Sequence, residues 1–220
     1  VTTKSWNINN FKLLRQKDKK HKWFLITDKK DLTWKKVKKI NPRFIFFPHW
    51  SWIIPKEIYN NFECIVFHMT DLPYGRGGCP LQNLIVRGHK NTKISALQVV
   101  KELDAGPIYF KRNLSLKDCA TKIFIKCSQI IFSMIVRIVA IEPKPLPQQG
   151  KVVEFKRRKP EESNIASLNN LEKVYDYIRM LDAEGYPRAF LETAAARFEF
   201  EDAKFKNGKL TAKVNIIKKI

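Results

Sequence analysis

The sequence of 220 residues lacks the signatures of a disulfide scaffold or a zinc protein, because its four cysteines form no CxxC pair and have no suitably spaced histidines. It also lacks a hydrophobic run long enough to cross a bilayer, since the longest one, residues 130–141, contains Arg137. No signal peptide is visible, and a few native residues are expected to be missing before Val1. We therefore expect a reduced cytoplasmic protein with no metal and no membrane contact.

Acidic residues are scarce beside basic ones, with 21 Asp and Glu against 42 Lys and Arg, a formal charge of +21. Residues 1–60 hold 15 basic and 4 acidic side chains, residues 61–150 hold 12 and 6, and residues 151–220 hold 15 and 11. Such a surplus attracts polyanions, but it falls along the chain and no RNA-binding motif accompanies it. We therefore favour a lysine-rich surface that draws anionic small molecules over a nucleic-acid partner.

The first half of the chain alternates strand and helix signals, as in βαβ units on a parallel sheet. With 44% hydrophobic residues the chain can build a core. The pattern predicts a Rossmann-like α/β fold with a mostly parallel sheet flanked by helices. The predicted strands of this region are Trp23–Thr27, Phe44–Phe47 and Cys64–Phe67.

The second half begins with a long apolar helix, Leu116–Ile141, and a proline-rich connector, Glu142–Gly150. An amphipathic helix over Leu168–Leu181 and a hairpin turning at Lys206–Gly208 follow. We therefore predict a catalytic domain over residues 1–150 and a small helix-plus-hairpin subdomain over residues 151–220.

Three polar side chains fall where predicted strands end, which is where open α/β sheets bind their ligands. His49 and His68 each follow a buried strand, and Asp104 lies in a small-residue turn. The loop after His68, Tyr74–Gly78, has three glycines that allow close backbone approach to a ligand. Each feature alone has an ordinary structural explanation, but together they predict one site.

This combination resembles the 10-formyltetrahydrofolate-dependent formyltransferase family, which includes enzymes acting on glycinamide ribonucleotide, methionyl-tRNA and sugar nucleotides. The family shows a strand ending in Asn-x-His, then Leu-Pro, Arg-Gly and Pro-x-Gln, and later a Leu-Asp-x-Gly turn. The matching residues here are His68, Leu72-Pro73, Arg76-Gly77, Pro80 with Gln82, and Leu103-Asp104 with Gly106.

The resemblance implies the formyl donor 10-formyltetrahydrofolate and a catalytic pair, His68 and Asp104. His68 would exchange a proton with the tetrahedral intermediate, and Asp104 would orient His68 or accept the amine proton through water. One departure is Val66, which stands where the family has an Asn that holds the developing oxyanion. Losing such a donor typically reduces the rate by on the order of a hundredfold.

The resemblance also implies binding residues around this pair. The folate would contact the strand-end loop and the Asp104 turn, through His49, Trp50, Trp52, Leu103 and Gly106. The acceptor substrate would contact Trp6, Tyr74, Gly75, Arg76, Gly77, Gly78, Arg157 and Arg158. Buried packing explains the tryptophans equally well, and a solvated basic run explains the two arginines.

We expect an N-formyltransferase that acts on the primary amine of a nucleotide-linked aminosugar, because residues 157–163 resemble an element of the sugar-nucleotide branch. The expected partner is thus a nucleotide sugar and no nucleic acid, with a homodimer left open. Two alternatives remain: a methionyl-tRNA formyltransferase, disfavoured by the small basic surplus of the last 70 residues, and a non-catalytic binding protein, suggested by Val66.

Overall fold

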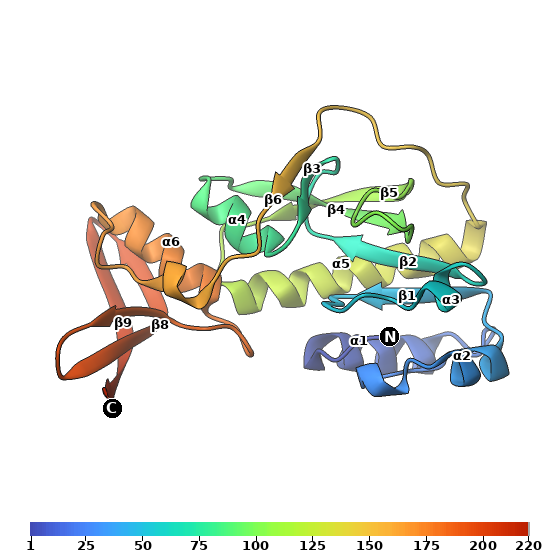
Figure 1. Cartoon of the computed structure of the whole chain (residues 1–220), viewed down its shortest axis with the longest axis horizontal. Helices are drawn as coiled ribbons and strands as arrows, with labels where there is room; N and C mark the ends of the chain where they lie inside the picture. The colour runs from blue at the N-terminus through green and yellow to red at the C-terminus, as the bar shows by residue number, and fades with distance from the viewer. Residues whose placement is uncertain (220) are drawn as a thin grey trace. The chain divides into compact units, whose positions relative to one another are not determined.

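The protein is described by a computed structural model that covers residues 1–219 (Figure 1). The chain divides into two compact units. Unit 1 comprises Val1–Gly77, Lys93–Leu114 and Phe124–Glu154, and unit 2 comprises Gly78–Thr92, Ser115–Ile123 and the segment from Phe155 onward. Each unit is therefore assembled from segments that are distant in sequence, and the division between residues 150 and 151 stays a prediction.

Helices and strands alternate through unit 1, as the sequence pattern predicts. Its elements are α1 (Ser5–Lys17), a 3-10 turn η1 (Lys29–Asp31), α2 (Trp34–Ile40), β1 (Phe44–Pro48), α3 (Lys56–Tyr59), β2 (Glu63–His68), β3 (Tyr74–Gly77), β4 (Asn91–Gln98) and β5 (Ile108–Ser115). The long helix α5 (Ala120–Ile141) begins among unit 2 residues and continues into unit 1, and the short strand β6 (Val153–Phe155) pairs with β3.

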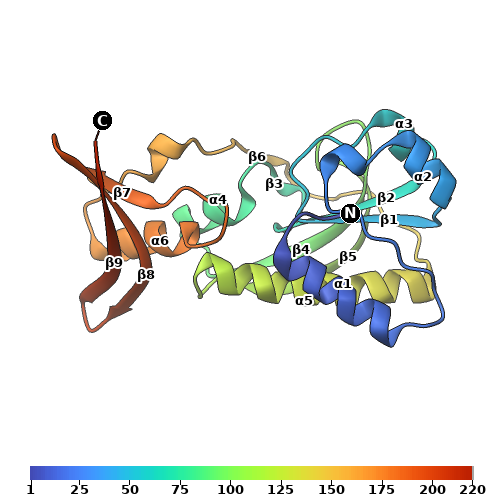
Figure 2. The same cartoon turned by 90° about the horizontal axis from the view of Figure 1, so that it is seen from below.

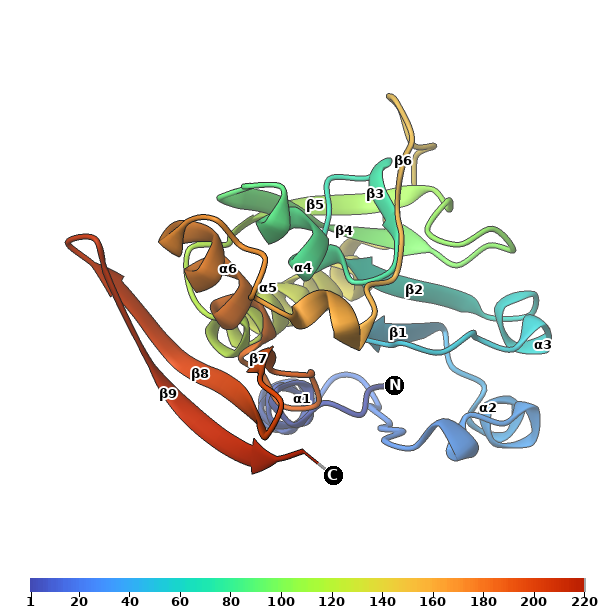
Figure 3. The same cartoon turned by 60° about the vertical axis from the view of Figure 1, so that its left-hand side comes forward.

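Unit 2 combines helices with a meander of strands (Figure 3). Its elements are α4 (Pro80–Val86), a 3-10 turn η2 (Pro160–Ser163), α6 (Leu171–Leu181), β7 (Ala189–Glu192), β8 (Ala196–Lys206) and β9 (Lys209–Lys218). The three strands form one sheet in the order β7-β8-β9, and the predicted turn at Asn207-Gly208 joins β8 to β9. Tyr175 of α6 stacks on Phe205 of β8, with ring centroids 6.0 Å apart.

The sheet of unit 1 has the order β1-β2-β4-β5. Strands β1 and β2 are parallel, with Pro48 opposite Phe67, and β4 pairs with β2 in the antiparallel direction. Helices α1 and α5 lie next to each other (Figure 2), and their contact includes the stacked rings of Trp6 and Phe124 at 5.5 Å. The predicted fold class, an α/β sheet with flanking helices and a β-rich C-terminal part, is confirmed.

Helix α5 is the one helix among residues 1–219 that is long and apolar enough to cross a membrane. The core helix of a globular protein passes the same test. Cys127, Ile131 and Ile138 of this helix are completely buried. The burial of these residues is that of a helix packed inside unit 1. The length and apolar composition of α5 alone therefore do not show that it spans a membrane.

The predicted strand at Trp23–Thr27 is wrong, because these residues have no regular secondary structure. Its apolar side chains do contribute to the core at Ile26, which is 6% exposed, whereas Phe24 remains 57% exposed. A strand needs a hydrogen-bonding neighbour on at least one side as well as a suitable side-chain pattern.

Candidate functional site

Parallel pairing of β1 with β2 brings the two predicted histidines to one edge of the sheet. Pro48 lies opposite Phe67, so His49 and His68 each follow one member of the same pair. His68 is 8% exposed and ends β2. Val66 lies on the same face of β2 as His68, because side chains two residues apart on a strand point the same way.

The imidazole of His68 is held on both sides within unit 1. Its Nε2 lies 2.7 Å from the carbonyl oxygen of Gly75, and its Nδ1 lies 3.5 Å from Oδ2 of Asp104. A carbonyl only accepts hydrogen bonds, so Nε2 carries a proton here. Its Nδ1 faces the carboxylate of Asp104, so the groups on the two sides of the ring fix the orientation of the imidazole.

Asp104 is positioned by backbone groups as well as by His68. The backbone of Asp104 adopts a left-handed conformation with φ of 52°. The carboxylate oxygen Oδ2 of Asp104 accepts a hydrogen bond of 2.9 Å from the N–H of Gly77. The turn can approach β4 closely because Gly106 has no side chain: a Cβ there would lie 1.8 Å from the carbonyl oxygen of Gln98. The structure therefore brings together the two predicted catalytic residues and part of the glycine loop.

Gln148 is a residue of this site that the sequence analysis missed. Its Nε2 donates to the carbonyl oxygens of Asp104 and Gly106, both at 2.8 Å, and its Oε1 accepts from Arg76 at 2.8 and 3.2 Å. The amide thus ties the turn of Asp104 to the loop that carries Arg76. A glutamine in a proline-rich connector gave no sequence signal other than its place next to those prolines.

The predicted folate loop after β1 contains buried polar atoms that lack partners. His49 adopts φ of 50°, and its Nδ1 lies 3.3 Å from Nε1 of Trp6 and 3.1 Å from Nδ2 of Asn7. Within residues 1–219, the buried atoms Nε2 of His49, Nε1 of Trp50 and Oδ1 of Asn7 have no hydrogen-bond partner. Buried polar atoms are normally paired, so these three atoms are exceptions in the core, and the assignment of this loop to folate stays a prediction.

The other predicted binding residues are divided between the units. Trp50 packs on Trp52 with centroids 4.8 Å apart, Trp52 is 41% exposed and Leu103 is 65% exposed. Tyr74 and Gly75 lie in β3, whereas Gly78, Arg157 and Arg158 belong to unit 2. A Cβ at Gly78 would lie 2.8 Å from Arg157, and Arg158 contacts Glu162 and the ring of Tyr177. Their assignments to folate or to the acceptor stay predictions.

Two backbone N–H groups of the glycine loop are already paired and offer no help to an oxyanion. The N–H of Gly77 is donated to Asp104 and that of Gly78 to the carbonyl oxygen of Phe155, at 3.0 Å. These two N–H groups are therefore occupied and do not replace the amide that Val66 lacks. Among the described residues there is no cluster of His, Cys, Asp and Glu that would hold a metal ion.

Acid should destabilise the protein through His49. Burial is the main reason that the pKa of His49 falls from 6.5 to about 4, and the charge of Lys4 adds to the shift. Between pH 6.5 and about 4 the unfolded chain therefore binds a proton at His49, whereas the folded chain does not. The free energy of unfolding falls as the pH falls through this range.

We expect His49→Gln to reduce that loss by on the order of 3 kcal/mol. Urea unfolding at pH 7.5, 5.5 and 4.5 checks this, with His21→Gln on an exposed side chain as the matched control. Parallel pH dependences for His49→Gln and the parent protein would contradict the burial of a neutral imidazole.

Two family profiles match the chain: "Formyl transferase" over residues 14–124 and "Methionyl-tRNA formyltransferase, C-terminal domain" over residues 160–217. The solved methionyl-tRNA formyltransferase from Clostridium thermocellum is 55% identical, with a TM-score of 0.97 over 99% of this chain and 97% of that chain. A methionyl-tRNA formyltransferase from Thermodesulfovibrio yellowstonii is 28% identical over 66% of this chain. The chain spans about half the length (50%) of that curated relative.

These relatives overturn two expectations. The sugar-nucleotide acceptor and the exclusion of nucleic acid are both wrong, because the solved structure at 55% identity, the curated relative from Thermodesulfovibrio and the C-terminal profile are all those of methionyl-tRNA formyltransferases. A sugar N-formyltransferase from Shewanella has a TM-score of 0.65 at 16% identity over 96% of this chain and 94% of that chain, which shows a shared fold alone. The error arose because we judged tRNA binding from charge near the C-terminus, although sequence position does not fix where charge lies on a folded surface.

The predicted enzyme class and its formyl donor, 10-formyltetrahydrofolate, are confirmed at the level of the family. The profile match covers 111 of 220 residues and includes His68 and Asp104. By this match and by its likeness to the Clostridium enzyme, the chain belongs to the formyltransferase family.

Proposed function

We propose that the chain transfers the formyl group of 10-formyltetrahydrofolate to the amino group of methionyl-tRNA. The observation that carries the proposal is the 55% identity to a methionyl-tRNA formyltransferase along nearly the whole chain, together with a C-terminal profile of the same name. The pair of His68 and Asp104 supplies the chemistry. A tRNA substrate also agrees with the expected location in the cytoplasm.

In the proposed reaction the neutral amine of the methionyl group attacks the formyl carbon. A carbon–nitrogen bond forms to the amine, the carbon–nitrogen bond to the folate breaks, and the amine loses one proton while the folate nitrogen gains one. Asp104 accepts the amine proton, directly or through a water molecule. The Nε2–H of His68, which rests on the carbonyl oxygen of Gly75, turns from that carbonyl to donate a hydrogen bond to the formyl oxygen as it becomes an oxyanion.

Val66 makes His68 more important in this reaction. A valine offers no hydrogen-bond donor on the sheet face that it shares with His68, and the N–H groups of Gly77 and Gly78 are already paired. His68 is then the side chain of this face that donates a hydrogen bond to the oxyanion. Removing it should therefore reduce the rate more than removing one donor from a site with several.

A basic surface near the N-terminus fits the proposed tRNA. Helix α2 exposes Lys35, Lys36, Lys38 and Lys39 within seven residues. Residues 1–60 hold 15 basic and 4 acidic side chains, so this half of unit 1 carries most of the surplus charge. Lysines arranged in this way neutralise phosphates and release counterions.

The acceptor is tested directly by an assay in which methionyl-tRNA is incubated with 10-formyltetrahydrofolate and the release of tetrahydrofolate is measured. We expect turnover with methionyl-tRNA, and kcat/KM should fall steeply as salt rises from 50 to 200 mM, by roughly tenfold or more. UDP- and dTDP-linked aminosugars serve as competing acceptors under the same conditions. Turnover of an aminosugar but not of methionyl-tRNA would refute the proposal.

The catalytic pair is tested with His68→Asn and Asp104→Asn, which replace the ionisable groups with a neutral amide; the second change is nearly isosteric. Each should lower kcat by about 100-fold or more, because general acid–base groups contribute rate factors of this order. The double variant should lose little more than either single variant, since the two residues are in contact and act as one unit. Circular dichroism and the melting temperature control for misfolding, and a folded variant with parental kcat would exclude the pair from the reaction.

Gln148 is expected to act through Asp104 as a positioning residue. Gln148→Glu replaces the donating Nε2 with an oxygen, so the carbonyls of Asp104 and Gly106 lose their partner while the contact to Arg76 is kept. We expect kcat to fall by roughly tenfold to a hundredfold with little change in KM for folate, since small displacements of catalytic groups are costly.

The matched control is Gln149→Glu, which makes the same chemical change at the next connector residue. A shift in the pH profile of kcat is expected for Gln148→Glu alone, because only this change alters the surroundings of Asp104. Equal kinetics for the two variants would assign Gln148 a purely structural role.

A further inference from the structure

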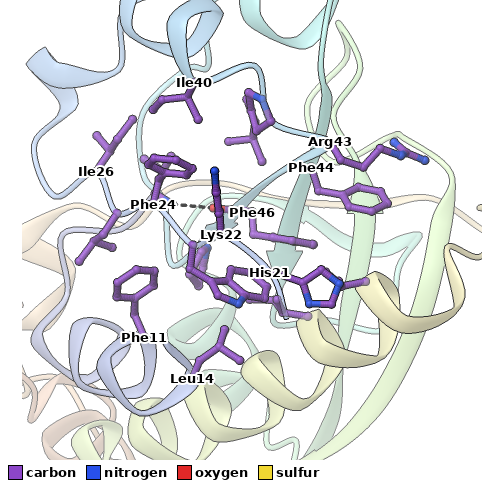
Figure 4. Close-up of a pocket in the computed structure, with 18 of the residues that line it drawn as sticks. Phe11, Leu14, His21, Lys22, Phe24, Ile26, Ile40, Arg43, Phe44 and Phe46 are labelled. Atoms are coloured by element: carbon purple, nitrogen blue, oxygen red, sulfur yellow. Dashed lines mark hydrogen bonds between the residues drawn. The ribbon is translucent and has the colours of Figure 1, made fainter. Parts of the chain in front are cut away.

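Unit 1 contains a cavity of about 640 Å³ with many apolar side chains on its walls, among them Phe11, Phe44 and Phe46 (Figure 4). The lining residues within positions 1–219 include neither His68 nor Asp104. The cavity is therefore separate from the catalytic pair, and the groups that bear on His68 lie in the loop that follows β2.

The carbonyl oxygen of Gly75 in this loop is placed to accept hydrogen bonds from two side chains. Nε2 of His68 lies 2.7 Å from the oxygen, and the hydroxyl Oγ1 of Thr70 lies 3.3 Å from the same oxygen. Gly75 is buried, and Thr70 is 0% exposed. A carbonyl oxygen has two lone pairs and can accept both bonds at once, so His68 shares its resting partner with a buried hydroxyl.

The backbone of this loop, residues 70–75, is tied to two neighbouring strands. Ser95 of β4 donates from Oγ to the carbonyl oxygen of Thr70 at 2.7 Å and accepts from the N–H of Leu72 at 3.4 Å. Lys111 of β5 donates to the carbonyl oxygen of Leu72 at 2.6 Å. Because the loop is held in this way, its backbone does not follow the imidazole when the imidazole turns, and the carbonyl group stays where it is.

The proposed reaction requires His68 to leave this carbonyl, because the same Nε2–H then donates to the developing oxyanion. A buried carbonyl oxygen that loses its only donor has no compensation for its desolvation, which would raise the barrier of the step. The hydroxyl of Thr70 prevents this loss. It lies beside the oxygen already, and a small movement of the side chain brings it from 3.3 Å to the usual O–H···O distance of about 2.8 Å.

We propose that Thr70 is a positioning residue that takes over the carbonyl oxygen of Gly75 when His68 turns to the formyl oxygen. The hydroxyl thereby lowers the free energy needed to release the imidazole from its resting hydrogen bond. The inference rests on the proposed formyl transfer, since it concerns the step in which the oxyanion forms. In this role Thr70 acts through His68 and takes no part in making or breaking bonds.

The kinetic test compares Thr70→Val, which removes the hydroxyl and keeps a branched side chain, with Thr70→Ser, which keeps a hydroxyl. We expect Thr70→Val to lower kcat for methionyl-tRNA by roughly tenfold, the effect of leaving one buried acceptor unpaired. The KM for 10-formyltetrahydrofolate should change by less than about twofold, because the hydroxyl matters only when the oxyanion forms. Thr70→Ser should retain most of the parental kcat.

A second measurement follows the Nε2 proton of His68 by NMR in the enzyme without substrate. Thr70→Val should slow the exchange of this proton with solvent by roughly tenfold, because the carbonyl of Gly75 then depends on His68 alone. The matched control is Ser95→Ala, which removes a buried hydroxyl from the same loop but leaves both donors of that carbonyl in place. Since this change only loosens the loop, exchange should stay the same or become faster.

Unchanged or faster exchange in Thr70→Val would overturn the proposal, because a merely structural hydroxyl gives that result. Turnover of methionyl-tRNA by the parent, with equal kcat for Thr70→Val and Ser95→Ala, would also overturn it and would leave the proposed function intact. If the parent does not formylate methionyl-tRNA, the proposed function fails, and the exchange of the His68 proton, which needs no substrate, decides the role of Thr70.

Discussion

The parallel register of β1 and β2 is the constraint on which the site depends. Because Pro48 lies opposite Phe67, the chain leaves both strands at the same edge, and the residues that follow, His49 and His68, enter one region. A shift of one residue would turn His68 to the other face of the sheet. Fully buried side chains such as Phe47 and Ile65 resist that shift, so the packing of the core fixes the location of the chemistry.

The turn at Asp104 adds the second half of the site, and it is held by groups from several parts of unit 1. The N–H of Gly77 fixes the carboxylate, and Gln148 fixes the backbone on which the carboxylate is carried. The pair is thus positioned by neutral hydrogen bonds, which orient the carboxylate without neutralising it.

Much of this arrangement could be predicted from the sequence. Buried runs such as Phe44–Phe47 and Cys64–Phe67 identified the strands, and the strand-end rule identified His49, His68 and Asp104 as neighbours. Gln148 could not be found, because its role depends on a long-range fold of an irregular connector. Residues Trp23–Thr27 have the side-chain pattern of a strand but no regular secondary structure, because a strand also needs a hydrogen-bonding neighbour and the local sequence does not show one. The prediction of a sugar-nucleotide acceptor was wrong, because counts of charged residues along the sequence do not show where those charges lie on the folded surface.

Gly106 links the stability of the fold to the accuracy of the site. Its backbone lies so close to Gln98 that a methyl group would collide with the carbonyl oxygen of β4. Relief of that collision would move the turn outward, and Asp104 two residues earlier would move with it. Substitution of Gly106 is therefore restricted both by its packing against β4 and by the position that Asp104 must keep. Related chains should almost always retain glycine here, even where they act on another acceptor.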